Sequence, residues 1–456
     1  MTECVIAKDG HSIKIRIKGI ADTAVYLANY YGPKLYYVDT AAADAKGLCE
    51  FNGEDTLPGG IYAIIFPDRK NYFEFVVTEQ QFYIETSKDD ILGSMKVKGS
   101  KENTLFFNYL RFIDKEQGKA DALKKQLSHL EEAGKSDSVQ IIRGELRKIN
   151  EGVKAYKLDF MEEHKGTFVA KIFKASKDPD VPDEVPVRPD GSTDSLFKFH
   201  YFKKHYLDGI DFSDSRLIRS PVLHNKVVHY IKKLTMQTPD SINAAADFLV
   251  EKARASKEVF KYLVHYITST YEKSKIMGMD AVFVHMAEKY YMAKECFWMD
   301  STQLAKLTER AITLRPLLIG KTIPNLTMQD TSGKWHILHE VKSKFTVLYI
   351  WDPDCGHCKK ETPKLKTLYD KFHPEGVEVY AVSTPLDNKE WIKYLREHTH
   401  DWIDVSDSPE FPSNFRDIFD VYSTPIIYLL DARKKILAKR LSVEQLEDFL
   451  SKKLKK

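Results

Sequence analysis

Cysteine is scarce in this sequence, with five residues in a chain of 456. So few thiols exclude a scaffold held together by disulfides, and the odd number leaves at least one cysteine outside any set of internal pairs. Cys49 and Cys296 have apolar neighbours, so we expect both to be buried core thiols. Cys4 lies in a segment that we expect to be disordered. Only Cys355 and Cys358 stand close together, in the run WDPDCGHCKKE.

The sequence also lacks a strong charge of either sign and a long apolar run. The formal net charge is +3, and acidic and basic residues alternate along the chain. A nucleic-acid-binding protein would concentrate positive charge on one face, so this class is not expected. No stretch approaches the roughly 20 apolar residues of a membrane-spanning helix, so we expect no transmembrane segment. The first residues contain no apolar signal core, so either the protein stays inside the cell or its export signal is absent from this chain.

The chain is long enough for two or three domains, and three patterns divide it. Residues 1–100 predict an all-β, sandwich-like domain, because segments such as SIKIRIKGI alternate apolar and polar residues and Gly, Pro and Asn fill the gaps. No catalytic constellation stands out there. We interpret its tyrosines as cross-strand packing, with a binding face as the alternative; they include Tyr30, Tyr31, Tyr36 and Tyr37.

Residues 101–319 predict a helical region. Segments such as ENTLFFNYLRFID repeat apolar residues at helical spacing. A Pro- and Asp-rich segment at 177–195 predicts an unstructured linker between helices. Histidines recur after it, but no HExxH-like pair is present, so we interpret them as surface or core residues. The region indicates a spacer or a platform for partners.

Residues 320–456 alternate strand and helix patterns, which predicts an α/β fold. The run KFTVLYIW at 344–351 is typical of a central buried strand, and the two cysteines follow it directly. A helix is expected after them. Further along, FPSNFRDIFDVY at 411–422 predicts another helix and TPIIYLL a strand.

Three kinds of site can use a CxxC pair. A zinc site needs four ligands, and the other cysteines are distant and isolated, so no metal is expected. A structural disulfide across so short a loop would gain little entropy and would be easily reduced. A redox pair fits better: Cys355 falls where a strand ends and a helix begins, and there the helix dipole stabilises a thiolate. His357 could lower the pKa of Cys355 further, whereas Asp352 and Asp354 would oppose this.

The third region resembles the thioredoxin fold and, within it, the TlpA/ResA-like envelope thiol–disulfide oxidoreductases. Trp351 lies four residues before Cys355, as the family's active-site tryptophan does. Pro363 falls where the active-site helix is kinked in thioredoxins. Thr424 and Pro425 match the cis-proline segment that faces the cysteines and holds the substrate strand. The β-rich start leading into helices also resembles the domain that precedes such thioredoxins in many Gram-negative envelope proteins.

The resemblance extends to the residues around the second cysteine. Glu361 stands where TlpA/ResA-like proteins carry an active-site glutamate, three residues after Cys358. Tyr349 occupies the place of thioredoxin's buried aspartate, so Glu361 is a candidate to take over its role; a solvated helix residue is the alternative. Gly356 and His357 form the dipeptide seen in protein disulfide isomerases, which leaves open whether the pair reduces or oxidises its substrates.

The resemblance implies dithiol–disulfide exchange on a protein substrate, with no cofactor beyond the redox-active disulfide Cys355–Cys358. Cys355 would attack, the Pro425 segment would hold the substrate, and Cys358 would resolve the mixed disulfide with help from Glu361. The partners implied are a protein disulfide and a thiol protein that donates or accepts electrons. The location implied is the periplasm or cell envelope, with the cytoplasm as the alternative. A binding scaffold and a peroxiredoxin are the alternative functions; the latter usually has a Thr shortly before its reactive cysteine, and WDPDC has none.

Overall fold

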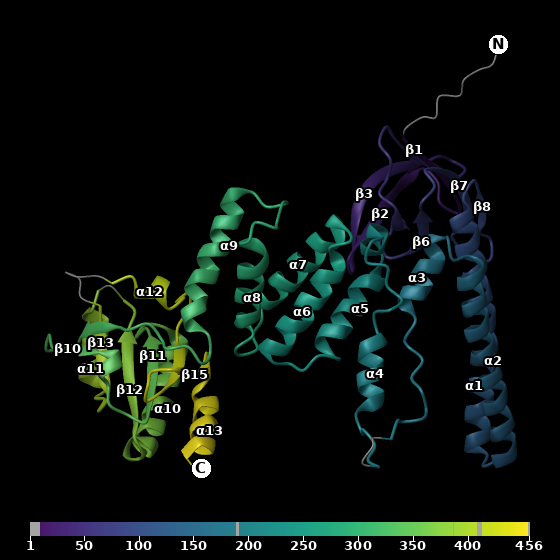
Figure 1. Cartoon of the computed structure of the whole chain (residues 1–456). Coiled ribbons are helices and arrows are strands. Elements are labelled where there is room, and N and C mark those ends of the chain that lie inside the picture. The colour runs from purple at the N-terminus through teal and green to yellow at the C-terminus, as the bar shows by residue number, and fades with distance from the viewer. Residues whose placement is uncertain (1–9, 188–190, 386, 408–412, 455–456) are drawn as a thin grey trace. The chain divides into compact units, whose positions relative to one another are not determined.

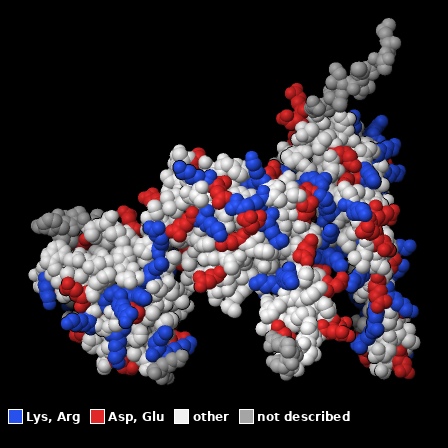
Figure 2. All heavy atoms as spheres, viewed as in Figure 1, with Lys and Arg blue, Asp and Glu red and all other residues white. Residues whose placement is uncertain are grey.

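The computed structural model describes residues 10–187, 191–385, 387–407 and 413–454. Cys4, and part of the linker expected at 177–195, lie outside these residues. The chain forms two compact units, the first comprising residues 1–236 and 248–262 and the second residues 237–247 and 263–456. Lys and Arg alternate with Asp and Glu over the face shown in Figure 2. No helix in the described ranges combines the length and the apolar character that a bilayer crossing requires.

The first unit begins with eight strands in two four-stranded sheets, which confirms the predicted β-rich domain. The sheet orders are β4-β1-β7-β8 and β3-β2-β5-β6. In β1, Ile13, Ile15 and Ile17 are fully buried and alternate with polar residues. Cys49 is buried, as expected. The strands are β1 (His11–Lys18), β2 (Thr23–Tyr31), β3 (Lys34–Ala43), β4 (Leu48–Gly53), β5 (Gly60–Ile65), β6 (Tyr72–Val77), β7 (Gln81–Ser87) and β8 (Lys96–Lys98).

The tyrosines of this domain differ in their contacts. Tyr30 donates a hydrogen bond of 2.6 Å to Glu74, and Tyr31 packs edge-on against Tyr262 at 5.5 Å. Tyr36 and Tyr37 on the edge strand β3 are 50% and 60% exposed. Tyr37 nevertheless packs across strands, with its ring 5.6 Å from that of Tyr26 on β2, whereas Tyr262, the partner of Tyr31, lies on helix α7 (Lys257–Glu272). Cross-strand contacts therefore account for Tyr30 and Tyr37, and a contact with a helix accounts for Tyr31.

Two long helices, α1 (Lys101–Glu132) and α2 (Ser136–Glu163), run side by side as a hairpin that turns at Gly134 (Figure 1). Aromatic contacts gather near its base. Phe112 stacks on Tyr156 with ring centroids 3.8 Å apart, and Tyr109 lies 4.0 Å from Phe173 of α3 (Phe168–Ser176). Toward the tip most side chains are exposed, and the ion pair Arg143–Glu131 at 2.8 Å is half exposed on both sides.

A buried asparagine joins the hairpin to the β-domain. Asn103 is fully buried; its Oδ1 accepts from the N–H of Val76 and its Nδ2 donates to the carbonyl of Val76, both at 2.7 Å. This single side chain satisfies two backbone groups of β6 that would otherwise be buried without partners.

Replacing Asn103 with Ala should lower the free energy of unfolding of the first unit by about 3 kcal/mol, because each orphaned buried group costs about 1–3 kcal/mol. Asn108→Ala, at an exposed position of the same helix, is the control and should change stability by less than about 0.5 kcal/mol. Urea unfolding followed by circular dichroism measures both. All five tryptophans lie in the second unit, so their fluorescence separates its transition from that of the first unit. Equal stability of the two variants would contradict the anchoring role.

The rest of the helical region confirms the prediction of a helical middle. The Pro- and Asp-rich segment contains neither a helix nor a named strand over its described residues. The helices after it are α4 (Phe197–His205), η1 (Ser215–Arg219), α5 (Pro221–Lys232), α6 (Pro239–Ala253), α7 (Lys257–Glu272), α8 (Asp280–Met286), η2 (Ala287–Tyr291), α9 (Ser301–Leu314) and η3 (Arg315–Leu317). Cys296, just before α9, is buried as expected.

The C-terminal part of the second unit is a seven-stranded sheet in the order β10-β9-β13-β12-β11-β14-β15. β11 pairs in parallel with β12 and antiparallel with β14, so it is an interior strand next to the middle of the sheet. The strands are β9 (Thr327–Gln329), β10 (Trp335–Ile337), β11 (Phe345–Trp351), β12 (Val377–Ser383), β13 (Ile403–Ser406), β14 (Ile426–Asp431) and β15 (Ile436–Lys439). The helices are η4 (Leu338–Glu340), α10 (Gly356–Phe372), η5 (His373–Glu375), α11 (Lys389–Glu397), α12 (Phe415–Ile418) and α13 (Val443–Leu454).

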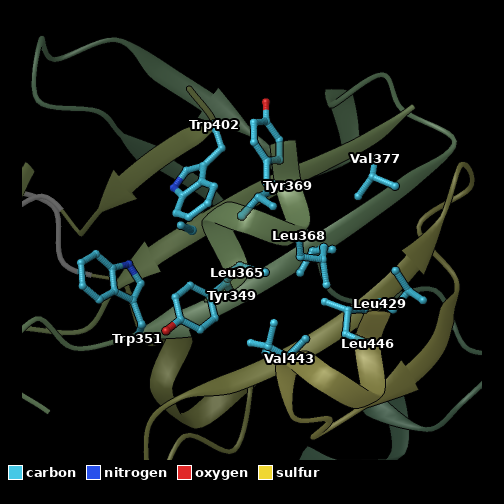
Figure 3. Close-up of a cluster of buried hydrophobic side chains, with 14 of the residues drawn as sticks. Tyr349, Trp351, Leu365, Leu368, Tyr369, Val377, Trp402, Leu429, Val443 and Leu446 are labelled. Atoms are coloured by element: carbon cyan, nitrogen blue, oxygen red, sulfur yellow. The ribbon is translucent and has the colours of Figure 1, made fainter. Parts of the chain in front are cut away.

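Side chains of β11 alternate between two hydrophobic cores. Val347, Tyr349 and Trp351 belong to the core that α10 and α13 cover, which Figure 3 shows in part. Leu348 and Ile350 belong to the core on the other face. Burial on both faces explains why the sequence of this strand is apolar throughout instead of alternating.

The prediction of a helix at 411–422 is wrong in length, because only the single turn α12 forms among the described residues of this range. The carboxylate of Asp407 accepts the N–H of Ser413 before the turn begins. Asp420 then adopts a positive φ of 53°, which a continuing right-handed helix does not allow. Phe415 and Phe419 are buried in the core, so their apolar spacing reflects packing.

Candidate active site

The two cysteines lie at the C-terminal end of β11. Trp351 ends β11, and Cys355 is the N-cap of α10, with Gly356 as the first helical residue. Both thiols are free; Cys355 is partly exposed and Cys358 is fully buried. One sulfur therefore meets solvent while the other faces the core one helical turn later.

Thr424 lies against the exposed thiol. The Sγ of Cys355 is 3.4 Å from the carbonyl oxygen of Thr424, and the bond between Thr424 and Pro425 is cis. Hydrogen bonding with Thr424 lowers the pKa of Cys355 most, and the backbone amides of Cys358 and His357 at the start of α10 lower it further, against a smaller opposing effect of burial. The exposed cysteine is the one more readily ionised.

The environment of Cys358 acts in the opposite direction. Burial raises the pKa of this thiol to about 11, even though the N–H of Asp352 donates to its Sγ at 3.5 Å. At neutral pH Cys358 is protonated while Cys355 ionises more easily. This difference is the one needed for an attacking and a resolving thiol.

Alkylation of the reduced protein across a range of pH should therefore modify Cys355 first. Its rate should rise with pH around a midpoint below that of an unperturbed thiol, because the pKa of Cys355 is lowered, whereas Cys358 should stay protected. Peptide mass spectrometry distinguishes the two sites, and the chain unfolded in urea is the control, in which both should react alike. Equal rates for the two cysteines in the folded protein would contradict this assignment.

Tyr349 cannot act as a proton acceptor in place of the buried aspartate that thioredoxin has at this position. Its hydroxyl bonds to Thr362 Oγ1 at 2.8 Å, and Thr362 donates to the carbonyl oxygen of Cys358 at 2.9 Å. Burial raises the pKa of Tyr349, so the phenol stays protonated and cannot accept a proton from Cys358 at neutral pH. It contributes to the packing and to the hydrogen bonding of α10 behind the cysteines.

Glu361 makes its contacts away from the sulfur atoms. Its carboxylate is bound by Lys364 at 2.8 Å and by the N–H of Val443, at the start of α13, at 3.3 Å. Lys364 also bonds to Glu444 at 2.6 Å. To assist Cys358, the carboxylate would have to leave these partners, so its catalytic role stays a prediction.

The remaining predicted residues surround the pair. His357 is exposed. Gly356 has open space beside it, because no atom outside its chain neighbours and its own helix backbone lies within 4 Å of the position that a Cβ would occupy. Pro363 lies inside α10. Trp351 is buried, stacked on Tyr349 at 6.1 Å and edge-on to Tyr394 at 5.0 Å. No cluster of three or more His, Cys, Asp or Glu suited to a metal ion occurs among the residues that the structure describes.

The sequence did not single out three residues that support the Thr424 segment. Asp420 has a buried carboxylate that is held by Arg310 of α9 at 2.9 Å and by Arg440 at 2.8 Å. The guanidinium of Arg310 also lies over the ring of the exposed Tyr422, 5.4 Å from its centroid. Residues so far apart in the chain give no local pattern that could have revealed this contact.

Three family models match separate parts of the chain. Residues 319–444 match the AhpC/TSA family, residues 11–106 match a domain of unknown function (DUF4369), and residues 158–315 match another (DUF5106). The first of these contains both cysteines and the Thr424–Pro425 segment.

Curated relatives share the part of the chain that holds the cysteines. The thiol-disulfide oxidoreductase ResA of a Bacillus cereus strain is 30% identical over 140 residues, which cover 29% of this chain and 78% of the relative. ResA of Bacillus subtilis (strain 168) is 28% identical over 118 residues, 26% of this chain and 64% of the relative, so just under two thirds of that protein is matched.

Solved structures also match. A domain of a possible thiol-disulfide isomerase from Cytophaga hutchinsonii is 42% identical and matches 31% of this chain and 95% of that chain, with a TM-score of 0.29. A thioredoxin-like protein from Bacteroides caccae is 20% identical and matches 60% of this chain and 99% of that chain, with a TM-score of 0.46.

Proposed function

Because the chain belongs to the ResA-like family of thiol–disulfide oxidoreductases and carries their thioredoxin-like domain, we propose that it reduces protein disulfides in the cell envelope through Cys355 and Cys358. The observation that supports this most is the difference between the two thiols. Cys355 is accessible and has a lowered pKa, whereas Cys358 is buried and has a raised one. The envelope location follows from the resemblance.

The proposed reaction transfers two electrons and two protons. The thiolate of Cys355 attacks one sulfur of the substrate disulfide, a mixed disulfide forms, and the other substrate sulfur leaves as a thiolate. Cys358 then loses its proton and attacks Cys355, which releases the second substrate thiol and leaves the Cys355–Cys358 disulfide. A thiol protein of the same compartment restores the dithiol by the reverse exchange.

Thr424 and Pro425 are proposed to hold the substrate at Cys355. The carbonyl of Thr424 lies 3.4 Å from the attacking sulfur, and proline offers no N–H of its own. A substrate backbone placed along this segment would bring its disulfide to the thiolate. Glu361 is proposed to accept the proton of Cys358 once it is freed from Lys364.

The first experiment is a measurement of the reduction potential of the Cys355–Cys358 pair in glutathione buffers. A value near about −270 mV, as in thioredoxin, supports a reductase that needs an electron donor, and one near about −180 mV supports an oxidant or isomerase influenced by His357. Cys358→Ser is the control and should show no two-electron couple. If the wild-type protein shows no reversible couple either, the scaffold hypothesis replaces this proposal.

A further inference from the structure

A cavity of about 360 Å³ lies within the second unit, between the loop that joins α7 to α8, helix α9 and the end of β15. Five of its lining residues are basic and two are acidic. Its lining includes neither the two cysteines nor the Thr424–Pro425 segment. Its charges and its position relative to Cys355 indicate what it can bind.

Two of the five basic residues are fully engaged by the protein. Lys439 is buried and bonds to the carboxylate of Asp280 and to the carbonyl of Leu317. Arg310 is bound by Asp420 and lies 3.6 Å from Glu272. Their charges are balanced inside the structure.

The other three basic residues reach solvent. Arg440 shares Asp420 with Arg310, and its side chain is 56% exposed. Lys273 and Lys275 are exposed on the α7–α8 loop, and neither forms an ion pair within the part of the chain that the structure describes. The rim of the cavity therefore carries an excess of positive charge, contributed by Lys273 and Lys275. Ile276 and Met277, 62% and 43% exposed, add an apolar surface beside it.

One lining residue of the cavity contacts the segment that leads to the reactive cysteine. Arg310, in its lining, covers the ring of Tyr422 at 5.4 Å, and Tyr422 is 82% exposed. Tyr422 precedes Thr424 by two residues, and the carbonyl of Thr424 lies 3.4 Å from the Sγ of Cys355. A substrate chain bonded to Cys355 and extended along the segment from Tyr422 to Thr424 would need on the order of five residues to reach the cavity, at about 3.3 Å per residue.

We propose that this cavity binds an acidic segment of the substrate protein, located a few residues from the disulfide that Cys355 attacks. This inference rests on the proposed disulfide exchange and adds the chemistry of its substrate. Lys273, Lys275 and Arg440 attract the acidic side chains, and the apolar residues of the loop contact the rest of the segment. The helical region thereby takes part in choosing the substrate.

The test uses the full chain, reduced beforehand, and two model peptides with an internal disulfide. The first peptide carries three Glu about five residues from the disulfide and is made in two versions, one with the Glu before the disulfide and one with the Glu after it. The second peptide carries three Gln at the same positions in each version. Single-turnover reduction is followed by counting the peptide thiols. At low salt we expect at least one Glu peptide to react about ten-fold faster than its Gln counterpart, and the preference should disappear at about 0.5 M salt.

The variant Lys273→Glu/Lys275→Glu should reduce that preference to less than about two-fold while it still reduces the Gln peptide at the wild-type rate. The matched control is Lys342→Glu/Lys435→Glu, which changes the charge equally. Its two exposed lysines lie near the start of β11 and the turn after β14, at the opposite end of the sheet from Trp351. The control should keep the full preference.

The outcomes separate this inference from the proposed function. Equal rates for the Glu and Gln peptides, or a preference that survives in Lys273→Glu/Lys275→Glu, would overturn the acidic docking site. Failure of the wild-type protein to reduce even the Gln peptide would instead overturn the disulfide exchange itself.

Discussion

Replacing Cys355 with Ser is expected to lower the single-turnover rate of disulfide reduction by at least about 1,000-fold. A hydroxyl at this N-cap position does not ionise at neutral pH, and the attacking group in disulfide exchange is the thiolate. Cys355 is also the accessible sulfur of the pair, whereas Cys358 is fully buried. Thiol release from a model protein disulfide measures the rate.

Cys358→Ser is the matched variant and should fail at a different step. Attack by Cys355 remains possible, so a mixed disulfide should accumulate and appear on non-reducing gels as a substrate adduct. Cys296→Ser, which changes a buried thiol outside the site, should show neither effect. If Cys355→Ser retained the wild-type rate, or if Cys358→Ser trapped no adduct, the assigned roles of the two cysteines would be wrong.

Trp351→Ala should lower the free energy of unfolding of the second unit by about 3–5 kcal/mol, the usual cost of removing a large aromatic side chain from a core. Trp351 is 1% exposed and contacts the rings of Tyr349 and Tyr394. It ends β11 next to the cysteine loop, so the cavity would open behind the active site. Guanidinium unfolding followed by the fluorescence of the remaining tryptophans measures the change.

Trp351→Phe provides a sharp control for the same position. The indole Nε1 has no hydrogen-bond partner among the described residues, so Phe removes no bond and keeps the aromatic contacts. We expect a loss of about 1–2 kcal/mol, clearly smaller than that of Trp351→Ala, because Phe keeps an aromatic ring but leaves part of the indole volume empty. A loss as large as that of Trp351→Ala would mean that the indole nitrogen has an essential contact, contrary to this structure.

Much of the fold could be predicted because local patterns determine it. The alternation in β1 follows from one buried face, and the apolar run of β11 follows from burial on both faces. The two cysteines could be placed for the same reason, since the strand and the helix that flank them are both evident in the sequence. The lowered pKa of Cys355 arises first from hydrogen bonding with the distant Thr424 and then from the start of α10, and only the latter is predicted by the spacing. The raised pKa of Cys358 arises from burial, which the spacing does not predict.

Other features depend on contacts between distant residues, and these were missed. The single turn α12 looked like a longer helix because Phe415 and Phe419 are spaced as on a helix, while the left-handed backbone of Asp420 has no sequence pattern of its own. The partners of Glu361 lie partly on α13, far along the chain. Arg310 and Arg440 meet at Asp420 only after α9 and β15 are in place.

The hairpin of α1 and α2 implies a gradient of local opening within the first unit. Aromatic packing around Tyr109 and Tyr156 and the hydrogen bonds of Asn103 hold the base of the hairpin. The tip at Gly134 depends on exposed ion pairs, which contribute little to the free energy of unfolding. Amide hydrogens should therefore exchange with solvent first near the tip and progressively later toward the base. Proteases should cut at the tip without releasing the β-domain from its anchor, because fraying of the helix ends does not require the base to open.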